Sequence, residues 1–155
     1  MTNSDIGINQ EMLGTSARII ELGATGSTSL GYLTVAEPPK NLPFEIKRVY
    51  WTYFTPNDVV RGNHAHRELE QVLVAVSGHI HVQTESIKGE IRDFHLMSPQ
   101  QGLYVPRLHW RTLKFSHSAV LLSLASLPYD PDEYIRSYDD FAALKQLFNK
   151  DVPAL

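Results

Sequence analysis

Residues 61–78 read RGNHAHRELEQVLVAVSG, and the rest of the sequence can be organised around this stretch. Its two histidines, His64 and His66, are two residues apart, so on a β-strand both rings lie on the same face. The apolar run Val72–Val76 follows and is typical of a short strand buried on both faces. An unpaired polar group that faces a protein interior costs roughly 2–7 kcal/mol, so the pair indicates a site of chemistry. The alternative is a pair of core histidines that are hydrogen-bonded to backbone carbonyls.

The composition excludes several classes of protein. A chain of 155 residues with 43% hydrophobic and 20% charged residues is typical of one soluble globular domain. A net charge of −3 gives no positive field that would gather nucleic acid or an anionic membrane. Cysteine is absent, so disulfides and thiolate metal sites are excluded. No apolar stretch reaches the roughly 18 residues of a membrane span, and no signal peptide is evident. We therefore expect a cytoplasmic protein.

Short β-strands dominate the rest of the chain. They are expected at Ala17–Leu22, Leu30–Ala36, Phe44–Phe54, His79–Gln83, Ile91–Leu96, Gly102–Val105, His109–Phe115 and Ala119–Leu127. Residues 23–29, rich in Gly, Ser and Thr, are expected to form a loop. Many short strands with frequent turns predict a sandwich or small barrel. We expect an N-terminal arm at 1–16, a single domain at 17–150 and a C-terminal tail at 151–155.

Side-chain periodicity places several residues on particular faces. In the strand at 44–54, alternation puts Arg48 and Tyr50 on one face. His79 and His81 share a face opposite Ile80 and Val82, so we expect these two histidines to face solvent. At the end of the domain, residues 138–149 carry apolar side chains at helical spacing. These are Phe141, Leu144 and Phe148. We expect an amphipathic helix packed on the outside of the barrel.

The histidine stretch resembles the first sequence motif of the cupins. That motif matches His64-x-His66, Gln71 and Gly78, with glutamine where a glutamate is usual. The second cupin motif resembles Gly102-x-x-x-Pro106 followed by Arg111, where the usual residue is histidine. The resemblance implies an all-β cupin, which is a jelly-roll β-barrel, here with a C-terminal helix. Many cupins bind a metal at these positions.

A longer series of motifs resembles the WxcM-type sugar 3,4-ketoisomerases. The matching segments are Ile46–Tyr50, Arg61–His66, Gln71–Leu73, Gly102–Pro106, Leu124–Ser126 and Tyr129–Asp139. This resemblance implies a homodimer that uses no metal or other cofactor. It implies a dTDP-linked substrate, dTDP-4-keto-6-deoxy-D-glucose, and a step toward 3-amino-3,6-dideoxyhexoses for surface glycans such as O-antigen.

Moving a ketone from carbon 4 to carbon 3 needs a base with a pKa near neutrality, and histidine supplies one. By its match to the family motif, His64 is the candidate for removing the proton on carbon 3. On the same face, His66 is the candidate partner, as a proton shuttle or as a group that orients His64. The phenol of Tyr50 can donate a hydrogen bond to the developing enediolate oxygen, although it could also be a barrel-lining aromatic residue.

The remaining candidates would bind the substrate. Arg48 and Arg61 have the fork geometry that a diphosphate needs. Tyr104 and Trp110 could stack on the thymine or the sugar, although aromatic strand residues are more often part of a core. Gln71 and Arg111 complete the candidate set.

Arg111 also bears on the product and on metal binding. In the resembling family, this position and one that matches Leu30 vary with the configuration at carbon 4. Arg111 favours the gluco product, while Leu30 matches neither expected pattern. The cupin metal-ligand positions would be His64, His66, Gln71 and Arg111, and a guanidinium cannot ligate a metal, so we expect none.

Three alternatives stay open. A dTDP-sugar 3,5-epimerase also shows Arg-Gly-x-His but usually lacks the histidine at the His66 position. A metal-dependent cupin oxygenase and a non-catalytic sugar-binding cupin are the others.

Overall fold

The computed structural model describes residues 15–150, so the predicted tail and nearly all of the predicted arm lie outside the described residues. The described strands are β1 (Arg18–Glu21), β2 (Thr25–Ser27), β3 (Gly31–Leu33), β4 (Arg48–Thr52), β5 (Val60–His66), β6 (Gln71–Ser77), β7 (Ile80–Ser86), β8 (Ile91–Leu96), β9 (Gln101–Val105), β10 (His109–Phe115), β11 (Val120–Ala125) and β12 (Tyr134–Ile135). A 3₁₀-helix, Pro131–Glu133, precedes β12, and one α-helix, α1 (Tyr138–Lys150), follows it.

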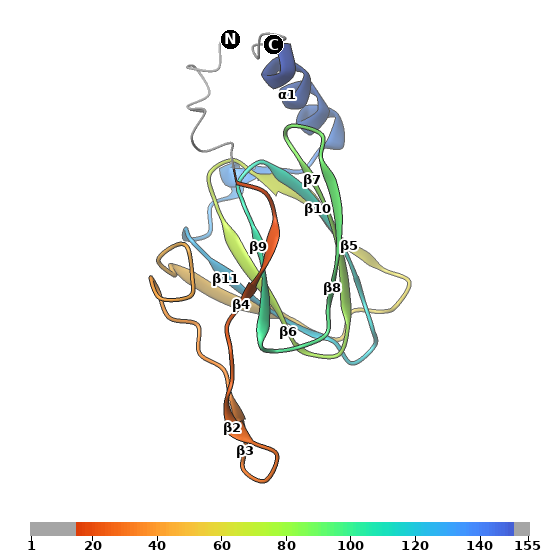
Figure 1. Cartoon of the computed structure of the whole chain (residues 1–155). Helices are drawn as coiled ribbons and strands as arrows, with labels where there is room; N and C mark the ends of the chain where they lie inside the picture. Colours follow the sequence, from red (N-terminus) through yellow and green to blue (C-terminus); the bar gives the residue numbers. More distant parts are fainter. Residues whose placement is uncertain (1–14, 151–155) are drawn as a thin grey trace.

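Two five-stranded antiparallel sheets form the body of the molecule. Their strand orders are β1-β9-β6-β11-β4 and β12-β5-β10-β7-β8. Figure 1 shows the two sheets facing each other as a flattened barrel. Because strands distant in sequence lie next to each other in both sheets, this is the jelly-roll architecture expected from the resemblance, and that expectation is confirmed.

Strand β6 runs through the middle of the first sheet and is buried on both faces, as predicted. Leu73 and Ala75 point between the two sheets, into the main apolar core. On the other face, Val72 and Val74 pack under Leu42, which belongs to the segment between β3 and β4. The apolar run is therefore covered from both sides, and only Val76, near the end of the strand, is exposed.

The C-terminal helix packs on the outside of the barrel, as its spacing predicted. Phe141 and Phe148 are buried against Trp110 and Ile135, with Leu144 partly buried beside them. Figure 1 shows α1 beyond one end of the barrel. Among residues 15–150, no helix has the length and apolar character needed to cross a membrane.

In the N-terminal third, the strands differ in number and length from those predicted. The expected loop at 23–29 contains β2, which pairs with β3 in a hairpin that projects from the barrel. A Cβ on Gly26 would lie 2.1 Å from the carbonyl oxygen of Gly31, so this close pairing requires glycine. In β4, Tyr50 is half-buried and Trp51 is exposed, which confirms the predicted alternation over a shorter strand.

Candidate active site

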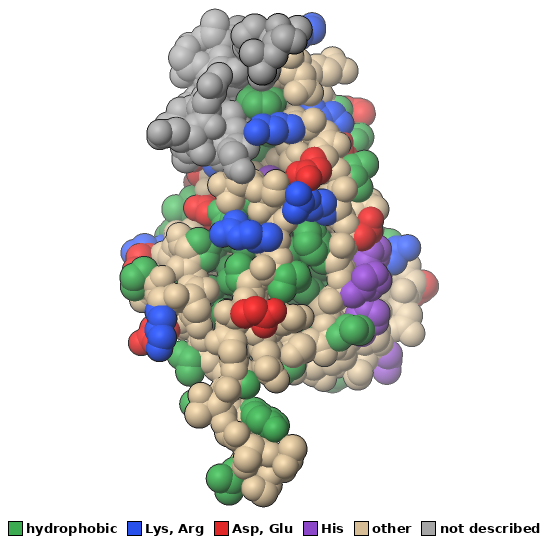
Figure 2. Space-filling view, viewed as in Figure 1, with side chains coloured by type: hydrophobic (Ala, Val, Ile, Leu, Met, Phe, Trp, Pro, Cys, Tyr) green, Lys and Arg blue, Asp and Glu red, His purple; other side chains and the backbone are tan. Residues whose placement is uncertain are grey.

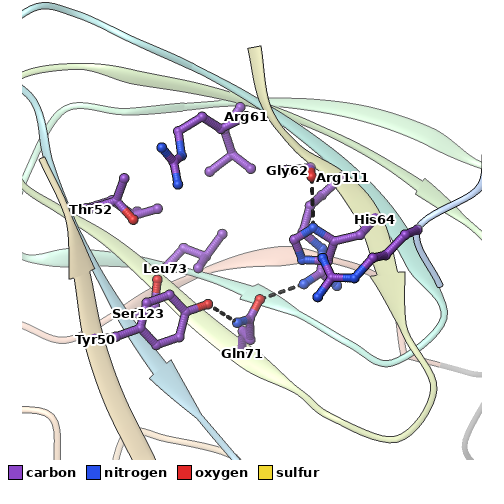
Figure 3. Close-up of a pocket in the computed structure, with 12 residues that line it drawn as sticks. Tyr50, Thr52, Arg61, Gly62, His64, Gln71, Leu73, Arg111 and Ser123 are labelled. Carbon is purple, nitrogen blue, oxygen red and sulfur yellow. Dashed lines mark hydrogen bonds between the residues drawn. The ribbon is translucent and has the colours of Figure 1, made fainter. Parts of the chain in front are cut away.

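A cavity of about 230 Å³ lies between the two sheets. Figure 3 shows its side chains converging from both sides. The lining comprises Tyr50, Thr52, Arg61, Gly62, His64, Gln71, Leu73, Arg111, Leu113, Leu121, Ser123 and Arg136. Five of the nine residues predicted for the site are therefore brought together here.

The cavity is built to attract a negative charge. Arg61, Arg111 and Arg136 line it, and none of the described residues in its lining carries a carboxylate. Guanidinium groups match phosphate and carboxylate oxygens with paired hydrogen bonds. A chain with an overall charge of −3 thus concentrates positive charge at one internal site.

An irregularity in β5 sets the position of His64. Gly62 and Asn63 both have positive φ angles, 84° and 53°. A Cβ at position 62 would lie 2.7 Å from the carbonyl oxygen of Arg111, so the close approach of the two strands requires glycine there. The pairing of β5 with β10 shifts register between Arg111 and Thr112. Bulges of this kind redirect side chains, and here His64 comes to lie opposite Arg111.

His64 is held as a neutral base. Its Nδ1 lies 2.9 Å from the carbonyl oxygen of Gly62. A carbonyl can only accept, so Nδ1 carries the hydrogen and Nε2 keeps its lone pair. Burial lowers the pKa of His64 to about 4, and the positive charges of Arg111 and Arg136 act in the same direction. The ring is therefore unprotonated at neutral pH. Its pKa is lower than the near-neutral value expected from the sequence, because the sequence shows neither the burial of the ring nor the two guanidinium groups beside it.

His66 lies next to His64, deeper in the protein. It is fully buried, and the two rings meet edge to face with centroids 4.8 Å apart. Burial lowers the pKa of His66 far below the ordinary histidine value, and Arg111 lowers it further. Neither ring nitrogen has a hydrogen-bond partner among the described residues. The alternative of two histidines bonded to backbone carbonyls therefore holds only for Nδ1 of His64.

A chain of hydrogen bonds connects Arg111 to Tyr50 across the floor of the cavity (Figure 3). Arg111 Nη1 donates to Gln71 Oε1 over 2.5 Å, and Gln71 Nε2 donates to the Tyr50 hydroxyl oxygen over 2.6 Å. Because a guanidinium can only donate, it fixes which end of the Gln71 amide faces it. The Tyr50 oxygen is thus an acceptor for Gln71, and its own hydrogen is left to donate to an oxygen in the cavity.

Arg48 adjoins the site without lining the cavity. Its guanidinium lies 5.0 Å from the ring centroid of Tyr50 and 5.4 Å from that of Tyr129. Its Nε and Nη2 atoms are buried and have no hydrogen-bond partner among the described residues. These two donors remain available to an anionic group.

The two aromatic residues predicted to stack on the substrate lie elsewhere. The ring of Trp110 packs under α1, 5.8 Å from that of Phe141, because β10 turns alternate side chains outward and inward. Tyr104 packs on the outer face of the first sheet, where its hydroxyl donates to Glu70. Both are core residues, the alternative raised for aromatic strand positions, and the structure does not bring either to the cavity.

Two residues at the site were not singled out by sequence reasoning. The ring of Tyr134 lies 5.1 Å from that of His64 and 4.4 Å from that of His66. Arg136 lines the cavity and stacks 4.1 Å above the Tyr134 ring. The signal was present, because the Tyr-Ile-Arg run belonged to the motif series. Only the pairing of β12 with β5, which sets Tyr134 opposite His66, reveals their role.

Comparison with protein families matches the FdtA model, described as WxcM-like, C-terminal, to residues 15–146. The chain belongs to the FdtA family. This FdtA-family chain is 44% identical over 114 residues to the TDP-4-oxo-6-deoxy-alpha-D-glucose-3,4-oxoisomerase of Aneurinibacillus thermoaerophilus, covering 73% of this chain and 81% of that protein. The resemblance to sugar 3,4-ketoisomerases is thereby confirmed.

Solved structures of sugar 3,4-ketoisomerases have the same fold as this FdtA-family chain. The WlaRB TDP-quinovose 3,4-ketoisomerase of Campylobacter jejuni superposes with a TM-score of 0.76 at 41% identity, over 82% of this chain and 97% of that chain. The QdtA sugar 3,4-ketoisomerase of Thermoanaerobacterium thermosaccharolyticum, in complex with TDP, gives 0.79 at 33% identity, over 88% and 97%. The similarity to both enzymes extends over most of the described barrel.

Proposed function

We propose that this chain is a 3,4-ketoisomerase that converts dTDP-4-keto-6-deoxy-D-glucose into a dTDP-3-keto-6-deoxyhexose. One observation carries the proposal: the neutral ring of His64, with Nδ1 bonded to Gly62, stands in a cavity lined by three arginines. That pairing supplies a base for the sugar and positive charge for the diphosphate. Its relative from Aneurinibacillus thermoaerophilus is named for the same substrate.

The reaction divides between two side chains that line the cavity. Nε2 of His64 removes the proton from carbon 3, and the electron pair forms the carbon 3–carbon 4 double bond of an enediolate. Tyr50 donates a hydrogen bond to the oxygen on carbon 4 as negative charge builds there. The hydroxyl proton on oxygen 3 is then lost, oxygen 4 gains one, and protonation of carbon 4 leaves the ketone at carbon 3.

The two buried neighbours of this pair have different roles. His66 packs edge to face against His64 and orients its ring, and a neutral His66 adds no positive charge beside the base. Gln71 accepts from Arg111 and donates to Tyr50, so the phenol is aimed by a fixed chain of hydrogen bonds.

Binding of the nucleotide falls to the arginines. The diphosphate carries two negative charges, and Arg61 and Arg136 approach the cavity from separate elements. Arg48 adds two buried donors without a described partner, close to Tyr50.

Product analysis tests the proposal. The protein is incubated with dTDP-4-keto-6-deoxyglucose in deuterated water, and the product is followed by NMR. We expect the carbonyl to move to carbon 3. Deuterium should appear at carbon 4 of the product unless the base returns the proton that it removed. Inversion at carbons 3 and 5 with the carbonyl unmoved would identify a 3,5-epimerase, and no turnover would leave a sugar-binding protein. The second histidine at position 66 already favours the isomerase.

The same spectrum gives the configuration of the product. We expect the gluco form at carbon 4, because Arg111 resembles the branch of the family that makes it. The 41% identity to an enzyme named for TDP-quinovose supports this expectation. A small coupling between the protons on carbons 4 and 5 would mean galacto and would contradict it.

A homodimer in the cytoplasm completes the proposal. The β2–β3 hairpin projects from the barrel with Leu30, Tyr32 and Leu33 largely exposed. Apolar surface of this kind is typical of an interface. Light scattering of the full chain at micromolar concentration should give twice the monomer mass. The substitutions Leu30→Ser and Leu33→Ser should weaken the dimer, whereas Ile91→Ser, at a comparably exposed position, should not. A monomer in the unmodified protein would contradict this part.

A further inference from the structure

Three histidines gather on the outer face of the hairpin formed by β7 and β8, away from the active-site cavity. His79 immediately precedes β7 and His81 lies within it, while His95 pairs with His81 across the two strands. Ile80 and Val82 in β7 are fully buried, so His79 and His81 lie on the solvent side, as the sequence predicted. His95 lies on the same side. Figure 2 shows histidine side chains gathered as a patch on this side of the molecule.

Two ring nitrogens in this cluster already stand at a chelating distance. His79 Nε2 and His95 Nδ1 are 3.2 Å apart. Two imidazole nitrogens bound to one tetrahedral zinc ion, each at roughly 2.0–2.1 Å, are separated by about 3.3 Å. A metal ion at this bond length from both nitrogens would lie off the line that joins them, so the two rings would have to tilt toward it. The ion would replace the hydrogen that now bridges the pair, and that hydrogen would move to the other nitrogen of its own ring.

The third histidine lies close enough to join them. The ring of His81 stacks on that of His95 with centroids 4.8 Å apart. His81 Nε2 is 2.7 Å from Asp93 Oδ1, which leaves Nδ1 of His81 free for a metal. Histidine ligands of metals commonly hold their second nitrogen against a carboxylate in this way.

We propose that His79, His81 and His95 bind one divalent transition-metal ion, with Zn²⁺ as the best match. Imidazole donors suit zinc, copper and nickel. In the described residues no three donors yet converge on one point, so binding requires the ring of His81, whose side chain is 33% exposed, to turn toward the other two. Water would complete the coordination. The site is independent of the isomerase reaction.

The position of the cluster gives the ion a structural consequence. β8 is the edge strand of its sheet, and β7 is its neighbour. The backbone of His79 is anchored in both directions: its N–H donates to Ser116 Oγ over 2.9 Å, and its carbonyl accepts from Ser116 N–H over 2.8 Å. An ion held by His79 and His95 would therefore fasten the edge strand to a fixed point of the barrel.

Calorimetric titration of the untagged protein with ZnCl₂ at pH 7.5 tests the proposal. We expect one ion per chain and a rise in melting temperature on binding. The double variant His79→Ala/His95→Ala should lose both, while Asp93→Asn should bind about 10- to 100-fold more weakly. His117→Ala, which removes an exposed histidine outside the cluster, is the matched control and should bind as the unmodified protein does.

Three results would overturn the proposal. They are no binding by the unmodified protein at 100-fold excess of zinc, unchanged binding by the double variant, and equal loss in the His117→Ala control. Unchanged binding by the double variant would locate the ion elsewhere, for example at His64 and His66. All of the substituted side chains are exposed or half-exposed, and far-ultraviolet circular dichroism checks that each variant is folded.

Discussion

The side chain of His64 turns back to its own strand and bonds through Nδ1 to the carbonyl oxygen of Gly62, 2.9 Å away. This contact fixes both the tautomer and the orientation of the ring. It depends on the positive φ of Gly62, where a side chain would meet the backbone of β10. Gly62 therefore has two roles: it allows the close pairing of β5 with β10, and its carbonyl holds the ring of His64.

Replacing His64 by asparagine should lower turnover strongly and leave substrate binding nearly unchanged. The amide is similar in size and can still donate to Gly62, but it has no basic nitrogen. A positioned general base is worth about 10²–10⁴-fold in rate, so kcat should fall by that factor while the affinity for TDP stays within a few-fold. Product NMR gives the rate, and calorimetric titration with TDP gives the affinity.

Two further variants make the result for His64 specific. His117→Asn changes an exposed histidine and should leave kcat unchanged. His66→Asn should cost less than His64→Asn if His66 only orients its neighbour or passes hydroxyl protons. If exchange at carbon 3 persists in His64→Asn and is lost in His66→Asn, the roles of the two histidines are reversed. Full activity in both variants would mean that the motif is structural.

The lowered pKa of His64 should appear in the pH profile. Burial and the neighbouring guanidiniums bring it to about 4, so the unprotonated base persists well below the ordinary histidine range. The ratio kcat/KM reports the free enzyme, and its acid limb should therefore fall below about pH 5. The diphosphate diester of the substrate does not titrate near neutrality, so the limb belongs to the enzyme. An acid limb between pH 6 and 7 would contradict this assignment.

The sequence predicted the barrel well because its signals are local. The continuous apolar run of β6 indicates burial on both faces, and the alternation within β7 indicates which of its side chains are buried. The spacing of Phe141 and Phe148 indicates the buried face of α1. The expected strand at Leu30–Ala36 contains β3, but β2 was missed because the glycines at 23–29 suggested a loop. Gly26 in fact permits close pairing of the two strands.

The site was predicted only in part, for a different reason. His64 and Gln71 were found because their motif lies in one continuous stretch. Tyr134 and Arg136 reach the cavity through the pairing of β12 with β5, about 70 residues apart in sequence, which no local pattern encodes. Conversely, Trp110 is of a residue type that often stacks on ligands. Only the packing of α1 against the barrel shows that its ring is buried in the core.

The substitution Trp110→Ala should therefore affect stability and not substrate affinity. The indole is 9% exposed and packs against Phe141 and Tyr138. Its loss should lower the free energy of unfolding by about 3–5 kcal/mol, measured by urea denaturation. Trp110→Phe keeps an aromatic ring in this place and should cost less. An increase in KM of tenfold or more at unchanged stability would instead show that Trp110 contacts the substrate.

The isomerase should be insensitive to chelators, because Arg111 stands where a cupin metal site needs a ligand. Its guanidinium is fully buried and donates to Gln71, so the third and fourth of the cupin ligand positions are bonded to each other and not to a metal. Burial lowers the pKa of Arg111 to about 10, which still leaves a cation at neutral pH. A cation at this position repels a metal ion from His64 and His66. Activity should be unchanged after dialysis against EDTA.

The converse experiment restores the donors that the cupin motifs usually carry. Gln71→Glu combined with Arg111→His, made in the His79→Ala/His95→Ala background, removes the buried cation and adds a carboxylate and an imidazole beside His64 and His66. Zinc binding at the cavity should then appear, with Kd measured by calorimetry, and isomerase activity should fall because the aim of Tyr50 is lost. If EDTA abolishes the activity of the unmodified enzyme and a divalent ion restores it, the metal-free mechanism is wrong.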